Sequence, residues 1–208
     1  MIFSHQRLAA AAAALLVVGA AHAADAKKAQ DPKLVKRGAY LVRLGGCADC
    51  HTPVKFDPDL GMPVPDLARA FSGHPEGAPD PAGAYAKPDI GVIGPTFTSF
   101  ALPFGVVYSA NITSDPTTGI GSWKVEAFVK SMRTGKHAGV GRPVLPPMPW
   151  LSIAGATDED LKAMFAFLQS TKPVKNAVPK PKVPPEAIQQ IGAAYEKMSA
   201  AHGPPAAK

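Results

Sequence analysis

The sequence predicts a mainly α-helical domain, and three observations lead to that prediction. Apolar residues recur every three or four positions in three separate stretches, which is typical of amphipathic helices. No stretch alternates convincingly between apolar and polar residues, as a half-buried strand would. The long segment between the first two of these stretches is rich in proline and glycine, which resist long regular elements. A length of 208 residues favours one domain with additions.

The N-terminus is predicted to be a secretory signal peptide that spans residues 1–23. Arg7 precedes an uninterrupted apolar run over residues 8–20, and residues 21–23 then read Ala-His-Ala, a small-x-small cleavage site. The apolar run is shorter than the about 20 residues that a membrane span needs. We therefore expect an exported chain that begins near Ala24 and has no transmembrane segment in its mature form.

The first helix is expected directly after a short polar leader. Asp31 is suited to cap a helix start, and Pro32 is suited to the first helical position. Apolar residues between Leu34 and Val42 recur at helical spacing. Gly45 and Gly46 follow and end the pattern.

Two further helices are expected in the C-terminal half. In the first, over residues 122–135, Ser122 is expected to cap the start and Gly135 to end the helix. In the second, Thr157 is expected to cap the start, acidic residues fill the first turn, and Pro173 stops it. The buried stripe of this last helix is predicted from its apolar spacing to be Leu161, Met164, Phe165 and Leu168.

Two long segments lie outside these helices. Residues 52–105 form a Pro/Gly-rich insertion, of the kind that covers a site or is partly disordered, with a short helical piece around residues 65–71. Residues 173–208 form a basic, proline-rich tail that should start extended and carry a surface helix over residues 186–201. The domain itself is assigned residues 24–172.

The charge balance argues against a nucleic-acid partner. The chain has 22 Lys and Arg against 16 Asp and Glu, a net charge of +6. A nucleic-acid footprint needs a dense basic face with base-stacking aromatics, and neither is visible. The excess is concentrated in the tail, where solubility is the simpler explanation and steering onto an acidic partner the alternative.

The most informative motif is CADCH, which holds both cysteines of the chain, Cys47 and Cys50, and then His51. A thioredoxin-like dithiol would need a preceding strand and a βαβ surround. A structural zinc site needs four ligands, and the adjacent Cys50 and His51 are poorly placed to reach one tetrahedral ion. Covalent haem attachment explains every position, because two thiols one helical turn apart can bond the two vinyl groups while His51 ligates the iron. The motif therefore predicts one haem c, with a zinc or dithiol module as the alternative.

A second axial ligand of the iron is expected from methionine, the usual partner of histidine in electron carriers. Met148 is the first choice because prolines on both sides stiffen its loop, which reads PPMPW. Met132 and Met164 lie on apolar faces of predicted helices, where packing is the simpler role. The remaining candidate ligands are Met62, His74 and His137.

Five stretches, taken in order, resemble class I c-type cytochromes, and look most like the haem c modules in cytochrome subunits of bacterial periplasmic dehydrogenases. They read RGAYLVRLGGCADCHTP, PFGVVYSANITSDPTTGIGSW, FVKSMRTGKH, RPVLPPMPW and TDEDLKAMFAFLQSTKPVKN. The resemblance implies a cytochrome c fold, with about three core helices around a covalently attached haem and Met148 as distal ligand. It also implies that Asn111 and Thr113 lie against the haem edge.

The function expected from the motif and the resemblance is single-electron transfer between redox protein partners in the periplasm. Such a carrier needs no proton donor or nucleophile, so the chain is predicted not to be an enzyme by itself. One alternative is a haem enzyme or gas sensor with an open sixth position, in which His137 or His74 acts as an acid–base group. The other is an electron-transfer subunit of a dehydrogenase complex.

Overall fold

The computed structural model describes residues 31–80 and 87–202. The predicted signal peptide and the last residues of the tail lie outside the described residues. The described helices are α2 (Pro32–Leu44), α3 (Cys47–His51), α5 (Val125–Thr134), α6 (Trp150–Ala154), α7 (Asp158–Ser170) and α8 (Pro185–His202). The described strands are β1 (Val54–Asp57), β2 (Met62–Pro65), β3 (Val92–Ile93), β4 (Ser99–Leu102) and β5 (Gly105–Tyr108).

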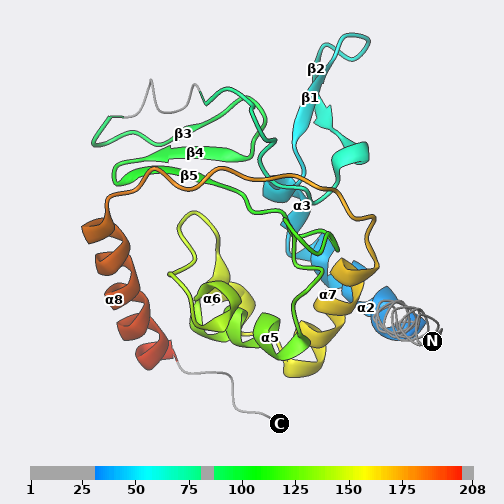
Figure 1. Cartoon of the computed structure of the whole chain (residues 1–208), viewed down its shortest axis with the longest axis vertical. Coiled ribbons are helices and arrows are strands. Elements are labelled where there is room, and N and C mark those ends of the chain that lie inside the picture. Colours follow the sequence, from blue (N-terminus) through cyan, green and yellow to red (C-terminus); the bar gives the residue numbers. More distant parts are fainter. Residues whose placement is uncertain (1–30, 81–86, 203–208) are drawn as a thin grey trace, which may run out of the picture. The chain divides into compact units, whose positions relative to one another are not determined.

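Helices and strands are mixed, so the expectation of a mainly α chain without strands was only partly correct. β1 and β2 form an antiparallel hairpin, and β3, β4 and β5 form an antiparallel three-stranded sheet (Figure 1). These strands are two to four residues long, too short for an alternating pattern to emerge. In β4, moreover, Ser99, Phe100 and Ala101 are all buried, so no alternation exists to be detected.

The core of the domain is the close pairing of α2 with α7. The backbone of Gly38 in α2 lies directly against Ala163 of α7. The approach is so close that a side chain at position 38 would collide with the Ala163 carbonyl group. Arg37 forms an ion pair with Asp160 at 2.9 Å beside this contact. The predicted buried stripe of α7 is confirmed, and its residues join Val42, Ile120 and Phe128 in one apolar group, called here the helical cluster: Val42, Ile120, Phe128, Leu161, Met164, Phe165 and Leu168.

Two of the predicted helix boundaries are confirmed and one is wrong. Thr157 caps α7 as expected, since its hydroxyl accepts a hydrogen bond from the backbone of Asp160 at 3.1 Å. Gly135 ends α5 in the left-handed conformation, also as expected. Ser122 does not cap α5, because that helix starts at Val125, after Lys124, which makes no side-chain capping bond.

The predicted tail runs along the body of the domain and packs onto it. Its extended part pairs with β5 through two backbone hydrogen bonds between Lys182 and Val106, of 2.8 and 3.0 Å (Figure 1). α8 follows, matching the helix predicted over residues 186–201, and its Tyr195 ring lies 4.9 Å from that of Trp150. A second apolar group, the sheet cluster, gathers here around Phe100, Val107 and Leu145.

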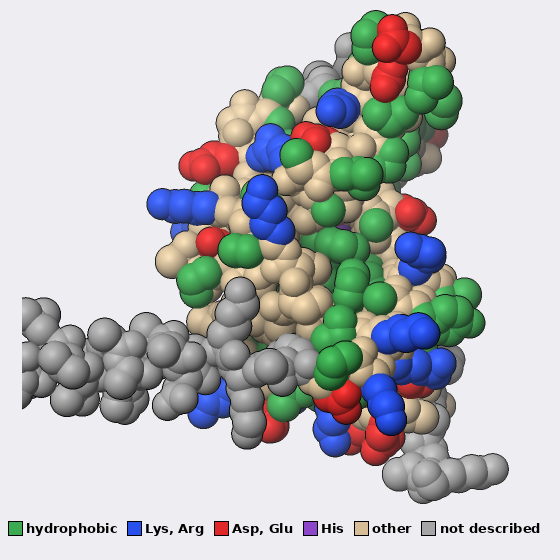
Figure 2. Space-filling view, turned by 90° about the vertical axis from the view of Figure 1, so that its right-hand side faces the viewer, with side chains coloured by type: hydrophobic (Ala, Val, Ile, Leu, Met, Phe, Trp, Pro, Cys, Tyr) green, Lys and Arg blue, Asp and Glu red, His purple; other side chains and the backbone are tan. Residues whose placement is uncertain are grey.

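The β1–β2 hairpin presents apolar side chains to solvent. Phe56, Leu60 and Met62 are 67%, 66% and 54% exposed. The upper end of the face in Figure 2 carries hydrophobic side chains beside acidic ones. None of the helices among residues 31–80 and 87–202 is both long and apolar enough to cross a membrane.

Candidate functional site

The CADCH motif forms α3, a single helical turn placed between the two apolar clusters. Gly46 precedes it in the left-handed conformation, which turns the chain sharply out of α2. Cys47 packs against the helical cluster, and Cys50 packs against the sheet cluster. The two thiols therefore project into different halves of the apolar interior, as the anchors of one large apolar group would.

Both thiols are partly shielded from water and are not joined to each other. Burial raises the pKa of Cys47, and the nearby Asp49 and Cys50 add to the effect. Burial likewise raises the pKa of Cys50, with a further contribution from Asp49. Redox-active dithiols depend on the opposite shift, a lowered thiol pKa, so the environment disfavours a thioredoxin-like role.

The alternative of a zinc site gains no support in the part of the chain that the structure describes. Among those residues, no three or more His, Cys, Asp or Glu side chains gather in a way that could hold a metal ion.

His51 is held in one tautomer by a backbone carbonyl. Its Nδ1 lies 2.7 Å from the oxygen of Ala110, and a carbonyl can only accept, so Nδ1 carries the hydrogen. Burial lowers the pKa of His51, although the bond to Ala110 opposes the shift. In the neutral imidazole, a hydrogen on Nδ1 leaves the lone pair on Nε2, which is the form that binds a metal.

The Ala110 carbonyl is held by a short pairing between residues 71–74 and 109–112. Two backbone hydrogen bonds join these segments, from His74 to Ser109 at 2.9 Å and from Ile112 to Phe71 at 2.9 Å, and Gly73 also donates to the backbone oxygen of His51 at 2.8 Å. Gly73 adopts a φ of 73°, and a side chain there would lie 2.6 Å from the Ala110 oxygen. Only glycine fits this position, so the 71–74 turn sets where the acceptor of His51 lies.

Asn111 and Thr113 form a buried network directly after Ala110. Asn111 Oδ1 accepts from the backbone N–H and the hydroxyl of Thr113, at 3.0 and 2.7 Å. Its Nδ2 donates to Thr118 Oγ1 at 3.0 Å and to the Val174 carbonyl at 2.8 Å. The amide thus uses its two donors and two acceptor sites within the protein. Contact of these residues with a haem edge remains a prediction.

Asp115 stabilises the same loop and gives it a defined dependence on pH. Its Oδ1 accepts from the backbone and hydroxyl of both Thr117 and Thr118, at 2.7 to 3.1 Å, which lowers the pKa of Asp115 to about 2. A lowered folded-state pKa adds stability above the unfolded value of about 3.9, and that stability is lost as pH falls toward the folded value.

We therefore expect the stability advantage of the wild type over Asp115→Asn to be constant above about pH 5 and to shrink between about pH 4 and pH 2. Urea midpoints measured for both proteins across this range check the expectation. An advantage that does not change with pH would contradict it.

Met148 lies in a loop anchored on both sides. Its backbone N–H donates to Leu145 at 3.3 Å, and Leu145 belongs to the sheet cluster that Cys50 contacts. Trp150, which is 2% exposed, starts α6 on the other side. The structure thus brings the Met148 loop to the cluster that one of the two cysteines touches.

The other candidate ligands have different surroundings. Met164 is part of the helical cluster, and Met132 packs against it. Met62 is on the exposed hairpin. His74 is buried, with Nδ1 3.0 Å from the Thr98 hydroxyl, and the His137 ring stacks edge-on with that of Trp123.

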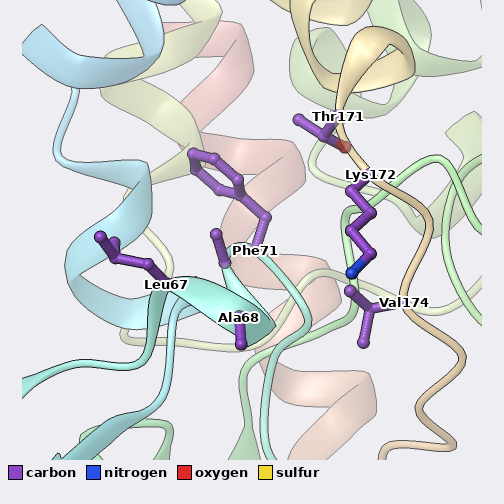
Figure 3. A pocket seen from close by; sticks show the side chains of 7 residues that line it. Leu67, Ala68, Phe71, Thr171, Lys172 and Val174 are labelled. Atoms are coloured by element: carbon purple, nitrogen blue, oxygen red, sulfur yellow. The ribbon is translucent and has the colours of Figure 1, made fainter.

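A pocket of about 330 Å³ opens beside Phe71. Figure 3 shows Leu67, Ala68 and Phe71 on one side and Thr171, Lys172 and Val174 on the other. Neither cysteine nor His51 lines it, so it is separate from the CADCH motif.

The known proteins most relevant to the CADCH motif are cytochrome subunits of bacterial dehydrogenases. No family model matches the sequence. The chain is 36% identical over 168 residues to "Alcohol dehydrogenase (quinone), cytochrome c subunit" of Gluconobacter oxydans (strain 621H), a match that covers 79% of this chain and 27% of that protein. It is 37% identical over 164 residues to "Gluconate 2-dehydrogenase cytochrome c subunit" of Pantoea cypripedii, covering 78% of this chain and 29% of that one. It is 31% identical over 151 residues to "Fructose dehydrogenase cytochrome subunit" of Gluconobacter japonicus, covering 72% and 24%. The chain therefore spans about a quarter of the length of these relatives.

Proposed function

Because the chain is homologous to the cytochrome c subunits of bacterial dehydrogenases, we propose that it binds one haem c and transfers single electrons between redox proteins. The observation that supports this most directly is the state of His51, whose Nδ1–H is fixed on Ala110 and whose Nε2 is free to act as a ligand. Two of the three relatives are named cytochrome c subunits and the third a cytochrome subunit, and the CADCH motif supplies both thiols.

The residues of α3 fit the proposed cofactor chemically. Cys47 and Cys50 carry protonated thiols in apolar surroundings, and each would add its sulfur and hydrogen across one vinyl double bond without losing an atom. His51 would supply the proximal nitrogen. When bound, haem supplies an iron that cycles between ferrous and ferric states; the protein's part is to hold, orient and shield it.

Met148 is our proposed distal ligand. Its loop is tied to Leu145 on one side and to buried Trp150 on the other, which limits how far the sulfur can swing. A rigid thioether donor favours the ferrous state and raises the reduction potential.

The proposed partners are protein electron donors and acceptors in the periplasm. The relatives are named as subunits of alcohol, gluconate and fructose dehydrogenases, so we propose a dehydrogenase of this general kind as the donor. The chain itself is proposed to perform no chemistry on a substrate. Export through residues 1–23 is part of the same proposal.

The proposed function is tested by a pyridine haemochrome spectrum and an intact mass. Protein produced with an active cytochrome c maturation pathway should be red, and its mass should exceed that of the processed polypeptide by one haem after denaturation, since thioether bonds survive unfolding. A colourless protein with the bare polypeptide mass would refute the proposal. Two haem equivalents would refute the single-haem part alone.

A further inference from the structure

We propose that Asn176, in the proline-rich segment after α7, is a positioning residue for His51, the ligand on which the proposed function rests. Asn176 is 1% exposed, although the residues on both sides of it are exposed. It lies 125 positions from His51 in the sequence, in a segment that the sequence analysis assigned to the tail.

The side chain of Asn176 clamps the turn that carries Gly73. Its Nδ2 donates to the carbonyl of Ser72 at 2.7 Å and to the carbonyl of His74 at 2.8 Å, the two residues that flank Gly73. Both hydrogens of one amide nitrogen are thus used to hold one turn, which fixes its carbonyls relative to each other.

Gly73 links the clamped turn to both the backbone and the side chain of His51. Its N–H donates to the backbone oxygen of His51 at 2.8 Å. Its α-carbon lies so close to the Ala110 carbonyl that no side chain fits between them, and this carbonyl accepts from His51 Nδ1. A change in the turn would therefore move the acceptor, the ligand backbone or both.

Asn176 is itself held firmly from its other side. Its Oδ1 accepts from the Glu76 N–H at 2.8 Å and from the Arg69 guanidinium at 3.3 Å. Its own N–H donates to Thr118 Oγ1 at 3.0 Å, in the network that contains Asn111. The amide is thus satisfied on all sides, and its carboxylate analogue would lack both donors while keeping its shape.

The expected electronic effect has a defined sign. A firm hydrogen bond from His51 Nδ1–H to Ala110 makes the imidazole a more basic ligand, and a more basic ligand stabilises the more highly charged ferric iron. Loosening the clamp weakens that bond, so the reduction potential should rise.

Asn176→Asp tests the clamp, with Arg69→Ala as the matched control. The aspartate keeps the acceptor toward Glu76 but loses both donors, whereas Arg69→Ala removes a partner of the same side chain and leaves both donors in place. In reduced protein loaded with haem, solvent exchange of the His51 Nδ1 proton, followed by NMR, should be roughly tenfold faster in Asn176→Asp, equivalent to about 1.4 kcal/mol. In Asn176→Ala, which removes both donors without adding a charge, the reduction potential should shift upward. Arg69→Ala should change the exchange rate much less than Asn176→Asp does, because both Nδ2 donors stay in place.

A further variant distinguishes a specific effect of Asn176 on His51 from a general loss of protein stability. Gln169→Ala removes another partly buried amide, which donates to the Ile120 carbonyl at 2.6 Å, and should lower stability without changing the His51 proton. If Asn176→Asp does not fold, Asn176→Ala, which brings no charge near the two carbonyls, is measured by the same criteria. Unchanged exchange and potential in the folded, loaded variant would overturn this inference alone. A colourless wild type would overturn the proposed function instead.

Discussion

Replacing Gly38 with alanine is expected to cost the domain about 3 kcal/mol of unfolding free energy, because the new methyl group has no space between α2 and α7. It would collide with the carbonyl oxygen of Ala163 and lie 2.8 Å from the β-carbon of Phe167. The obstructing carbonyl belongs to the α7 backbone and cannot turn aside, so the two helices would have to separate. Separation would open the helical cluster along its length.

The expected loss outweighs the opposing gain in helix propensity. Alanine is better than glycine in a helix by about 1 kcal/mol. Domains of this size are stable by about 5–15 kcal/mol, so a net loss of this order is a large fraction of the total. Urea unfolding followed by far-UV circular dichroism measures the difference.

Gly192→Ala is the matched control for Gly38→Ala. It makes the same substitution inside a helix, α8, where the nearest atom to the added carbon would be Pro143 Cγ at 3.7 Å, an ordinary contact. We expect it to leave stability unchanged or raise it by up to about 1 kcal/mol. If Gly38→Ala behaved like Gly192→Ala, the close pairing of α2 with α7 would be wrong.

Replacing Met148 with alanine is expected to lower the reduction potential by on the order of 0.1 V, within the range of about 0.8 V that axial ligands span. Met148 is the proposed distal ligand, and the loss of a thioether ligand disfavours ferrous iron. The vacant position should also admit carbon monoxide rapidly in the reduced protein, whereas the wild type should bind it slowly. Redox titration and carbon monoxide mixing followed in the visible spectrum give both quantities.

Met62→Ala is the control for Met148→Ala. Met62 is 54% exposed on the β1–β2 hairpin, so its removal should leave the potential and the carbon monoxide kinetics unchanged. If Met62→Ala changed the potential and Met148→Ala did not, Met62 would replace Met148 as the proposed distal ligand. Fast carbon monoxide binding by the wild type would instead favour the open-site alternative of an enzyme or sensor.

The sequence predicted the elements whose signals are local. The helix of residues 32–44, the Thr157 cap and the buried stripe of α7 each follow from neighbouring residues, and the structure confirms them. The CADCH motif is equally local, because Cys47, Cys50 and His51 all lie within the short helix α3.

The sequence could not predict what depends on distant pairing. The acceptor of His51 is a backbone carbonyl 59 positions away, and a backbone atom leaves no residue-type signal. Gly73 was one of many glycines in a Pro/Gly-rich insertion, and nothing in the sequence marks it as the one against Ala110. Asn176 looked like an ordinary polar residue in an extended tail, since its four side-chain partners come from residues 69–76.

The pairing of the proline-rich segment with β5 also restricts the addition of further strands at that edge of the sheet. β5 is the last strand of its sheet, and such a strand offers unpaired backbone groups to which a second molecule could add. Lys182 pairs with part of the β5 edge. Pro181 and Pro184, on either side of it, lack the N–H groups that a further strand would need for hydrogen bonding. The segment therefore covers part of the β5 edge, where a strand of a second molecule could otherwise pair.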